Sequence, residues 1–289
     1  MRKRIYVLSG CIISFFILLI TYTLLLNKNR IQNDLLIRPM SGIVYVSDDS
    51  LKVYMDFFYK NGSKKDDSEF LAQWKYFYWI TEDGDRIPVK GAGIDPKDYH
   101  RIEDTLYSRA FFSFILSNEI MNGRTELNIV AIEFSVDNKE YIRKNVGKLM
   151  IKNCTDISSE VSVVETTWAS IRYFSPMLKN YPVYFVNRLS EEITLTDVDL
   201  GNSGWKKDID TVTVEAASEY EATLNIRDES ESDDPRVVLM RPLYTFTDSQ
   251  GNVLKVVQSG LSIYTMGLQD KNTILKLKTI NGENDDQSH

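Results

Sequence analysis

Residues 74–89 read WKYFYWITEDGDRIPV, and this stretch decides the fold class. It begins with an aromatic-rich run, continues through a polar turn that contains Gly84, and returns as a short apolar run. Two strand-like runs joined by a polar, glycine-containing turn are typical of a β-hairpin. The stretch therefore predicts an antiparallel pair, Trp74–Thr81 followed by Arg86–Val89.

The rest of the chain repeats this pattern, because short apolar runs alternate with clusters of Asp, Ser, Asn and Gly. In the first half the expected strands are Ile43–Val46, Leu51–Phe58, Phe111–Leu116, Leu127–Ser135, Lys139–Arg143 and Lys148–Ile151. In the second half they are Val161–Tyr173, Val183–Val186, Ile193–Leu200, Thr211–Val214, Glu221–Ile226, Val237–Thr247, Asn252–Val257, Leu261–Thr265 and Ile274–Ile280. A short helix is expected at Asp95–Leu106, which an Asp-Pro pair introduces. Closely spaced strands predict a mainly β protein built as a β-sandwich.

A faint internal repeat bears on the number of sandwiches. Residues 78–89 and 244–256 both contain Tyr-x-apolar-Thr-acidic, then a polar turn with Gly, then an apolar return run. We therefore expect two β-sandwich domains, at 41–153 and 160–280, followed by a disordered tail at 281–289. One elaborated sandwich is the alternative, since any two hairpins drawn from these residue types look alike.

Two segments of the second half resemble bacterial immunoglobulin-like surface modules. Asn187–Thr196 reads NRLSEEITLT, a polar turn that enters a strand, and Val212–Leu224 reads VTVEAASEYEATL, a second turn that enters an alternating strand. The resemblance implies Ig-like β-sandwich domains and an extracellular setting. It transfers no functional residue, because this fold carries many unrelated functions.

The N-terminal region predicts a membrane tether. Ile5–Leu26 is uncharged and largely apolar, and a helix of that length spans the roughly 30 Å hydrocarbon core of a bilayer. Three basic residues at 2–4 precede the run and two follow it, which favours a cytoplasmic N-terminus. We therefore predict a cytoplasmic stub at 1–4, a single-pass signal anchor at 5–26 that contacts membrane lipid, a linker at 27–40 and an extracellular remainder.

Two forms of processing are alternatives to an uncleaved anchor. A secretory signal peptide needs a shorter apolar region and a small-x-small cleavage site, whereas this run ends in Leu24-Leu25-Leu26-Asn27. Leu8-Ser9-Gly10-Cys11 resembles a bacterial lipobox, but most of the apolar run follows Cys11. The pattern favours a cysteine buried in an intact helix.

Charge and cysteine content limit the partners of the extracellular part. The formal net charge is −7, and the first thirty residues carry five basic and no acidic side chains, which leaves −12 for the remainder. Such an acidic ectodomain repels nucleic acid. Cys11 lies within the apolar run, so Cys154 has no intrachain partner for a disulfide. We therefore expect a bacterial cell-envelope protein rather than a disulfide-stapled animal domain.

The sequence offers no recognisable catalytic or cofactor motif. Histidine occurs at His100 and His289, no His/Cys cluster has zinc spacing, and phosphate-binding and nucleophile-elbow motifs are absent. One acidic cluster could supply oxygen ligands to Ca²⁺, namely Asp228, Glu229, Glu231, Asp233 and Asp234. It lacks the glycine of a Ca²⁺ loop and matches a solvated hairpin tip better. We expect a protein that is not an enzyme and needs no cofactor or metal.

The aromatic run is the candidate binding site. Strict alternation places Trp74, Tyr76 and Tyr78 on one face of the strand and Phe77 and Trp79 on the other. Since one sheet face joins the core, the other would present aromatic rings to a sugar or a protein partner. Burial under the connection Val89–Leu106 or at a domain interface is the alternative. A second aromatic cluster suits interdomain packing equally well and consists of Tyr173, Phe174, Tyr181, Tyr184 and Phe185.

Together these patterns predict a membrane-anchored extracytoplasmic interaction protein. The first expectation is a non-catalytic accessory subunit of a bacterial envelope or membrane assembly, with a protein partner. The alternative is a cell-wall or glycan-binding module that uses an exposed Trp74–Trp79 face. A third is an envelope hydrolase, whose turnover would depend on a carboxylate or on His100.

Overall fold

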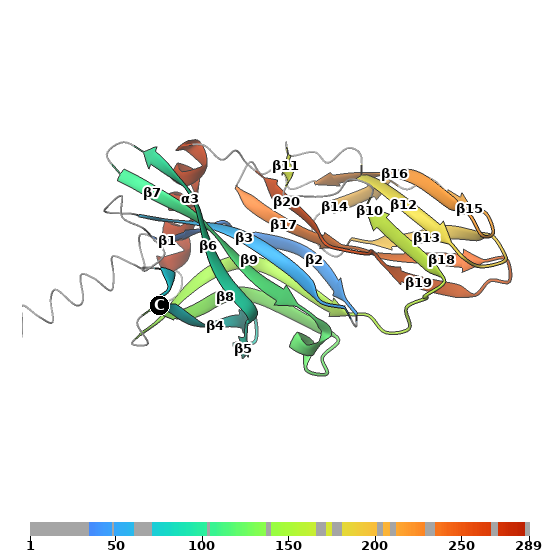
Figure 1. Cartoon of the computed structure of the whole chain (residues 1–289), viewed down its shortest axis with the longest axis horizontal. Helices are drawn as coiled ribbons and strands as arrows, with labels where there is room; N and C mark the ends of the chain where they lie inside the picture. Colours follow the sequence, from blue (N-terminus) through green and yellow to red (C-terminus); the bar gives the residue numbers. More distant parts are fainter. Residues whose placement is uncertain are drawn as a thin grey trace, which may run out of the picture.

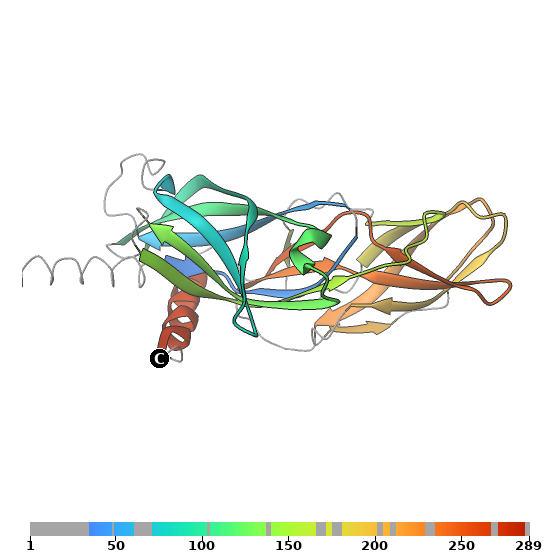
Figure 2. The ribbon, with the colours of Figure 1, turned by 90° about the horizontal axis from the view of Figure 1, so that it is seen from below.

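A computed structural model describes residues 35–47, 49–60, 71–102, 105–136, 140–165, 172–174, 181–200, 205–208, 212–228, 235–266 and 271–286. These residues form an elongated molecule in which strands predominate (Figures 1 and 2). The prediction of a mainly β protein is confirmed. No helix within these ranges is long and apolar enough to cross a membrane. The predicted anchor Ile5–Leu26 and the stub lie outside the described residues.

The N-terminal lobe is a sandwich of two sheets. One has the strand order β1-β3-β7-β6, with β1 at Leu35–Ile37, β3 at Leu51–Lys60, β7 at Thr105–Leu116 and β6 at Lys90–Ile102. The other contains β2-β9-β8-β4-β5, with β2 at Met40–Val46, β9 at Glu140–Asn153, β8 at Glu126–Val136, β4 at Trp74–Thr81 and β5 at Arg86–Pro88. The helical turn η1, Asn118–Met121, connects β7 to β8. Between the sheets lies a core rich in Trp and Phe.

The C-terminal lobe is a second two-sheet sandwich. One sheet has the order β10-β12-β16-β14, with β10 at Val161–Glu165, β12 at Tyr181–Asn187, β16 at Glu219–Asp228 and β14 at Trp205–Asp208. The other has the order β15-β13-β18-β19, with β15 at Val212–Val214, β13 at Ile193–Asp199, β18 at Leu243–Asp248 and β19 at Val253–Val257. Its core is mainly Val, Leu and Ile, and a register shift between Leu195 and Asp197 interrupts the alternation along β13.

The two lobes share strand β17, Arg236–Arg241. This strand pairs in parallel with β2 and antiparallel with β20, Ser262–Met266, which in turn pairs with β11, Arg172–Phe174. Side chains of a strand point alternately to opposite faces. Val237 and Leu239 therefore pack into the N-terminal core, while Val238 and Met240 pack into the C-terminal core. The second predicted domain thus contributes a strand to the sheet of the first.

Two glycines allow β2 to approach its neighbours closely. Gly42 has φ +113°, and a Cβ atom on it would lie 2.1 Å from the carbonyl oxygen of Leu239. Gly147 has φ +84°, and a Cβ there would lie 2.2 Å from the carbonyl oxygen of Met40. A side chain at either position would collide with main chain that cannot move aside. Both parallel pairings of β2 therefore depend on glycine.

A buried arginine joins the lobes. The Arg241 guanidinium donates to the carbonyl oxygens of Gln258 and Tyr45, at 2.8 and 2.9 Å, and forms a bidentate pair with the Asp49 carboxylate. Burial raises the pKa of Asp49, but hydrogen bonds from Arg241 and Ser47 outweigh it, so the pKa lies below its usual value. Nearby, the Tyr45 hydroxyl donates to Asp199; burial and this bond raise the tyrosine pKa. These contacts connect β2 and the loop after it to β13, β17 and the end of β19.

Four sequence expectations need correction. Ile274–Ile280 lies in helix α3, Lys271–Asp286, because Ile274 and Leu277 pack on Leu36 and Phe58 while Leu275 is exposed, which is a helical spacing. This helix also reaches into the predicted tail at 281–289. In the predicted helix Asp95–Leu106, residues 95–102 are extended in β6 and 105–106 in β7, with Pro96 at a register shift. The predicted linker 27–40 ends in strand β1, whose side chains are buried.

Candidate binding site

The predicted β4–β5 hairpin forms, but β4 is not a regular strand. Lys75 pairs with Ser135 and Tyr78 with Glu133, so Tyr76 and Phe77 together stand opposite one residue of β8. Tyr76 has φ +54°, in the left-handed region that non-glycine residues seldom adopt. This β-bulge shifts the alternation of side chains by one position in the middle of the aromatic run.

Because of the bulge, the predicted open aromatic face does not form. Trp74 and Trp79 are buried, and Phe77 packs against the same core. The Trp74 ring stacks on Phe134 with centroids 4.8 Å apart, and the Trp79 ring meets Phe114 edge to face at 4.7 Å. Alternation had placed Trp74 and Trp79 on opposite faces, and the bulge turns both inward. These indoles hold the lobe together.

The outward side of β4 and its neighbours carries a smaller aromatic group. Tyr76 and Tyr141 are 56% and 49% exposed. Tyr78 is half-buried; it follows Tyr76 on β4, and Tyr141 lies across β8 on strand β9. The Arg86 guanidinium lies between two rings, 4.0 Å from the Tyr78 centroid and 4.2 Å from the Tyr141 centroid. Glu133 pairs with Arg86 at 2.5 Å. We call Tyr76, Tyr78, Arg86 and Tyr141 the tyrosine–arginine surface.

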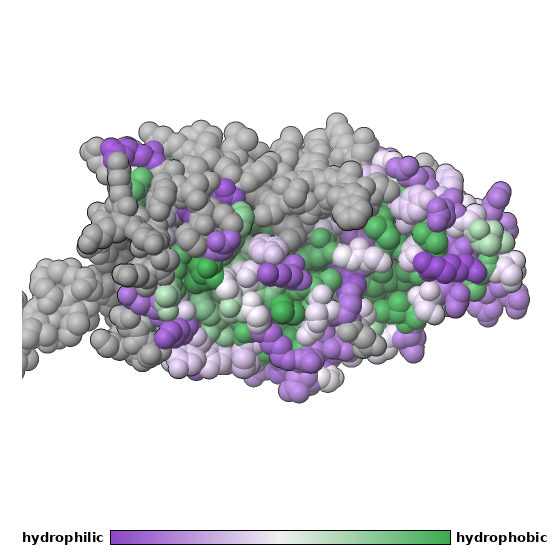
Figure 3. Space-filling model, viewed as in Figure 1, coloured by the Kyte–Doolittle hydropathy of each residue, from purple (hydrophilic) through white to green (hydrophobic). Residues whose placement is uncertain are grey.

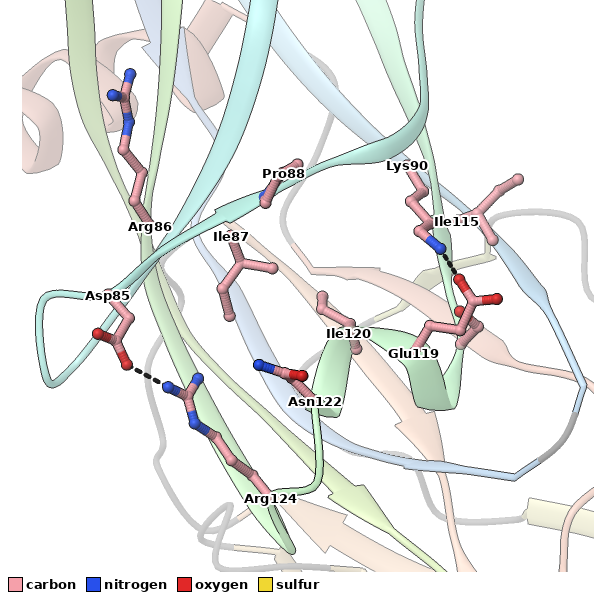
Figure 4. A pocket seen from close by; sticks show the side chains of 11 residues that line it. Asp85, Arg86, Ile87, Pro88, Lys90, Ile115, Glu119, Ile120, Asn122 and Arg124 are labelled. Carbon is pink, nitrogen blue, oxygen red and sulfur yellow. Dashed lines mark hydrogen bonds and ion pairs between the residues drawn. The ribbon is translucent and has the colours of Figure 1, made fainter.

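Next to this surface lies a cleft of about 390 Å³, which we call the β5 cleft (Figure 4). Its walls come from the β4–β5 turn, β5, the end of β7 and the η1 region. The residues that line it are Asp85, Arg86, Ile87, Pro88, Lys90, Ile115, Ser117, Glu119, Ile120, Asn122 and Arg124. Ion pairs close both ends, one between Lys90 and Glu119 and one between Arg124 and Asp85. Figure 4 shows Ile87 and Ile120 pointing into the space between them.

In the view of Figure 3, hydrophobic residues form small patches that hydrophilic residues separate. Within the described ranges no group of three His, Cys, Asp or Glu side chains is placed to hold a metal ion. Of the predicted Ca²⁺ cluster Asp228 ends β16, whereas 229–234 lie outside the described residues, as does His289. His100 lies in β6.

The Cys154 thiol is partly buried, and burial raises its pKa, which makes it a poor nucleophile at neutral pH.

The second aromatic cluster of the sequence includes Phe185. Its ring is buried in the C-terminal core against Tyr244 and Phe246, with centroid distances of 5.9 and 5.5 Å. It therefore packs within one lobe, not between two.

Sequence reasoning missed Arg86, Tyr141 and the β5 cleft. Tyr141 and Arg86 meet the aromatic run only through the pairing of β9 with β8 and of β5 with β4. The cleft needs the η1 region, 30 residues along the chain, to fold back beside β5. Arg86 and Tyr141 each lie in a predicted strand. The predicted hairpin paired the strand of Arg86 with the aromatic run, but nothing in the sequence indicated that the strand of Tyr141 would lie near both.

No family model and no curated protein matches the chain. Among solved structures, the D00-D0 domain of Intimin is 10% identical, with 80% of this chain and 98% of that chain covered and a TM-score of 0.22. The periplasmic chaperone SfaE is 11% identical, with 80% and 98% covered and a TM-score of 0.20. The Bacteroides ovatus glucan-utilisation protein SGBP-B, solved with a mixed-linkage heptasaccharide, is 12% identical, with 79% and 45% covered and a TM-score of 0.20. At these TM-scores the likenesses decide no functional question, and the resemblance to immunoglobulin-like modules stays a prediction.

Proposed function

We propose that this chain is a non-catalytic binding protein that recruits a protein partner through the tyrosine–arginine surface. The observation that carries the proposal is the β4 bulge, which buries Trp74 and Trp79 and holds Tyr76 outward in a strained conformation. Strained non-glycine residues and bulges concentrate at functional sites, where surrounding structure holds them in place. The buried rings of Trp74 and Trp79 and the half-buried ring of Phe77 supply that support.

The composition of the surface supports a protein partner. Tyrosine and arginine are enriched among the residues that dominate the binding energy of protein interfaces. Arg86 is already fixed by two rings and by Glu133, so it would lose little side-chain freedom when a partner binds. A planar guanidinium with one edge toward solvent can still pair with a carboxylate or a main-chain carbonyl.

The cellular setting is part of the proposal. We propose that Ile5–Leu26 anchors the chain in the cell membrane with the N-terminus in the cytoplasm and the two lobes outside, as an accessory subunit of a bacterial envelope assembly. The uncharged run and the basic residues before it support this topology. The start of β1 at Leu35 would then place the N-terminal lobe close to the bilayer.

Glycan binding is the second candidate function. The observation that favours it is the exposure of the Tyr76 and Tyr141 rings, since flat rings can stack on sugars. Against it, one face of the Tyr78 ring and one of the Tyr141 ring are occupied by Arg86. A protein partner therefore remains the first proposal.

Co-purification of the full-length chain from its own membranes tests the proposal. The unchanged chain should retain a stoichiometric membrane partner in mild detergent, and Arg86→Ala or Tyr141→Ala should reduce it by about thirtyfold, as expected for a dominant interface residue. Tyr220→Ala is the matched control, because Tyr220 is 46% exposed on β16 of the other lobe. Equal recovery with all three variants, or a chain that purifies alone, would contradict the proposal, and binding to cell-wall glycan that Tyr141→Ala abolishes would favour the second function.

A further inference from the structure

The β5 cleft has the size and shape of a side-chain receptor. Its volume of about 390 Å³ lies at the lower end of the range for small-ligand sites, which suits one or two side chains rather than a folded domain. Arg86 belongs both to the cleft wall and to the tyrosine–arginine surface. A partner that covers that surface therefore reaches the mouth of the cleft.

The apolar wall of the cleft suits an aliphatic ligand better than a sugar. Ile87, Ile115 and Ile120 form it together with Pro88, and none of the described residues that line the cleft is aromatic. Sugar rings are held chiefly by stacking on aromatic faces, which this lining does not provide. Branched aliphatic walls complement an aliphatic side chain, whose burial removes apolar area from water.

Polar groups between the isoleucines match a peptide main chain. Asn122 follows the last residue of η1 and has φ +46°. Its main-chain N–H donates to the carbonyl oxygen of Glu119. Figure 4 shows its carboxamide directed between Ile87 and Ile120. A carboxamide both donates and accepts, as a peptide group does, so it can pair with the main chain on one side of an inserted residue. Ser117 adds a hydroxyl to the same lining.

Strand β5 lies at the edge of its sheet, but Pro88 makes the addition of a partner strand to this edge unfavourable. Hydrogen bonds from Thr81 N to Asp85 O, at 3.0 Å, and from Val89 N to Phe77 O, at 2.9 Å, set the hairpin register. In that register Arg86 and Pro88 direct their main-chain groups away from β4, and Pro88 has no N–H to donate. Proline on an edge strand blocks addition of another strand.

We infer that the β5 cleft receives one aliphatic side chain from an extended segment of the protein partner, with Asn122 bonded to the main chain of that segment. The ion pairs Lys90–Glu119 and Asp85–Arg124 close the ends and limit the pocket to one residue. Each end offers one acidic and one basic side chain, so flanking charged residues of either sign in the segment find a partner. This inference rests on the proposed function and names the chemistry of its partner.

Selection of displayed random peptides on the full-length chain in lipid nanodiscs tests the inference. Enriched peptides should share Leu, Ile, Val or Met at one fixed position. In a synthetic copy of an enriched peptide, alanine at that position should weaken binding by about tenfold or more. Ile120→Trp, which fills the cleft, should produce a loss of at least the same size.

Two further variants keep the test decisive. Val253→Trp is the matched control, because Val253 is an exposed apolar residue of β19 in the other lobe, and binding should be unchanged. If Ile120→Trp unfolds the chain, Asn122→Gly removes the carboxamide in a backbone conformation that glycine tolerates, and binding should fall about threefold to tenfold.

The outcomes separate this inference from the proposed function. Peptides anchored on an aromatic residue, binding insensitive to both cleft variants, or displacement of the peptides by cell-wall saccharides would overturn the inference. Failure to enrich any peptide above the background on empty nanodiscs would do so too. Loss of partner recovery with Arg86→Ala would still uphold the proposed function in each of these cases, and peptide binding without partner recovery would uphold the cleft alone.

Discussion

The two lobes both pack aliphatic side chains between two sheets, but in the part of the chain that the structure describes the N-terminal core alone adds buried tryptophans, Trp74 and Trp79. The C-terminal core is mainly Val, Leu and Ile, with Phe185, Tyr244 and Phe246 as its buried rings, and one register shift interrupts the pairing of β13 with β18. The N-terminal core uses stacked Trp and Phe side chains, and its strands β4, β6 and β8 carry register shifts. The tyrosine–arginine surface and the β5 cleft both lie on the N-terminal lobe, where more of the strands carry register shifts.

The difference shows how a sandwich can hold tyrosine side chains outward without losing its core. Large rings fill the space that an irregular strand leaves, because each covers more area than a branched aliphatic side chain. The bulge in β4 can therefore turn Tyr76 outward while Trp74 and Trp79 stay buried. Among the described residues of the C-terminal core the buried rings are Phe185, Tyr244 and Phe246, which pack edge to face and include no tryptophan.

The largest expected effect comes from removing one ring in each core. Trp79→Ala and Phe246→Ala should each lower the free energy of unfolding by about 3–5 kcal/mol. Because β17 contributes to both cores, each variant should shift one common transition in urea, followed by far-UV circular dichroism. Two separate transitions, of which each variant moves a different one, would show that the lobes unfold independently.

Gly42→Ala should be the next most damaging change. A Cβ atom would meet the Leu239 carbonyl at 2.1 Å, so β2 and β17 must separate, at a cost of about 3 kcal/mol. Gly251→Ala is the control, since Gly251 has φ +87° but nothing within 4 Å of a built Cβ, and only backbone strain of about 1 kcal/mol is added. Urea denaturation measures both, and equal losses would show that the β2–β17 contact is not tight.

Tyr76→Gly should stabilise the chain while weakening partner binding. Glycine relieves a strained φ of +54°, worth about 1 kcal/mol, and Tyr76 buries little surface. Ala217→Gly is the matched change in the C-terminal lobe, where φ is +47°. Thermal unfolding should show a similar gain for both variants, whereas partner recovery should fall for Tyr76→Gly alone. A loss of stability at Tyr76 would mean that its conformation carries no strain.

The smallest expected effect is a loss of stability in acid at the junction. The pKa of Asp49 is lower when folded than when unfolded, so its pairing with Arg241 stabilises the chain above about pH 4 and is lost as the pH falls through the folded pKa. Asp49 is half exposed, so the contribution is below about 1 kcal/mol. Melting temperatures between pH 6 and pH 3 should fall less for Asp49→Asn than for the unchanged chain; identical slopes would exclude this role.

Local sequence patterns anticipated much of the fold and little of the site. Glycine-containing turns and period-two runs were sufficient for the hairpins at β4–β5 and β18–β19, where Gly84 and Gly251 have positive φ. The same period-two reading failed at Leu275–Leu277, where packing of Ile274 on Leu36 and Phe58 decides for helix. The sharing of β17 between lobes was not visible either, since parallel pairing with β2 joins residues about 200 positions apart.

Which aromatic side chains of β4 are exposed depends on a shift of one residue in its pairing with β8. Strict alternation along 74–79 predicted that Trp74 and Trp79 lie on opposite faces, and a single bulge at Tyr76 and Phe77 places both on the core face. The residue types of an aromatic strand do not reveal a bulge, because aromatic residues occur at both the buried and the exposed positions. Arg86 and Tyr141 come from other strands, so only the assembled sheet shows the surface.

Site-specific crosslinking of the full-length chain in its own membranes tests the central claim most directly. A photo-crosslinking phenylalanine analogue in place of Tyr76 should give one discrete protein adduct, and the added substitution Arg86→Ala should abolish it. The same analogue in place of Tyr220 should give none. An adduct from position 220 together with none from position 76 would contradict the claim that the N-terminal lobe carries the binding surface.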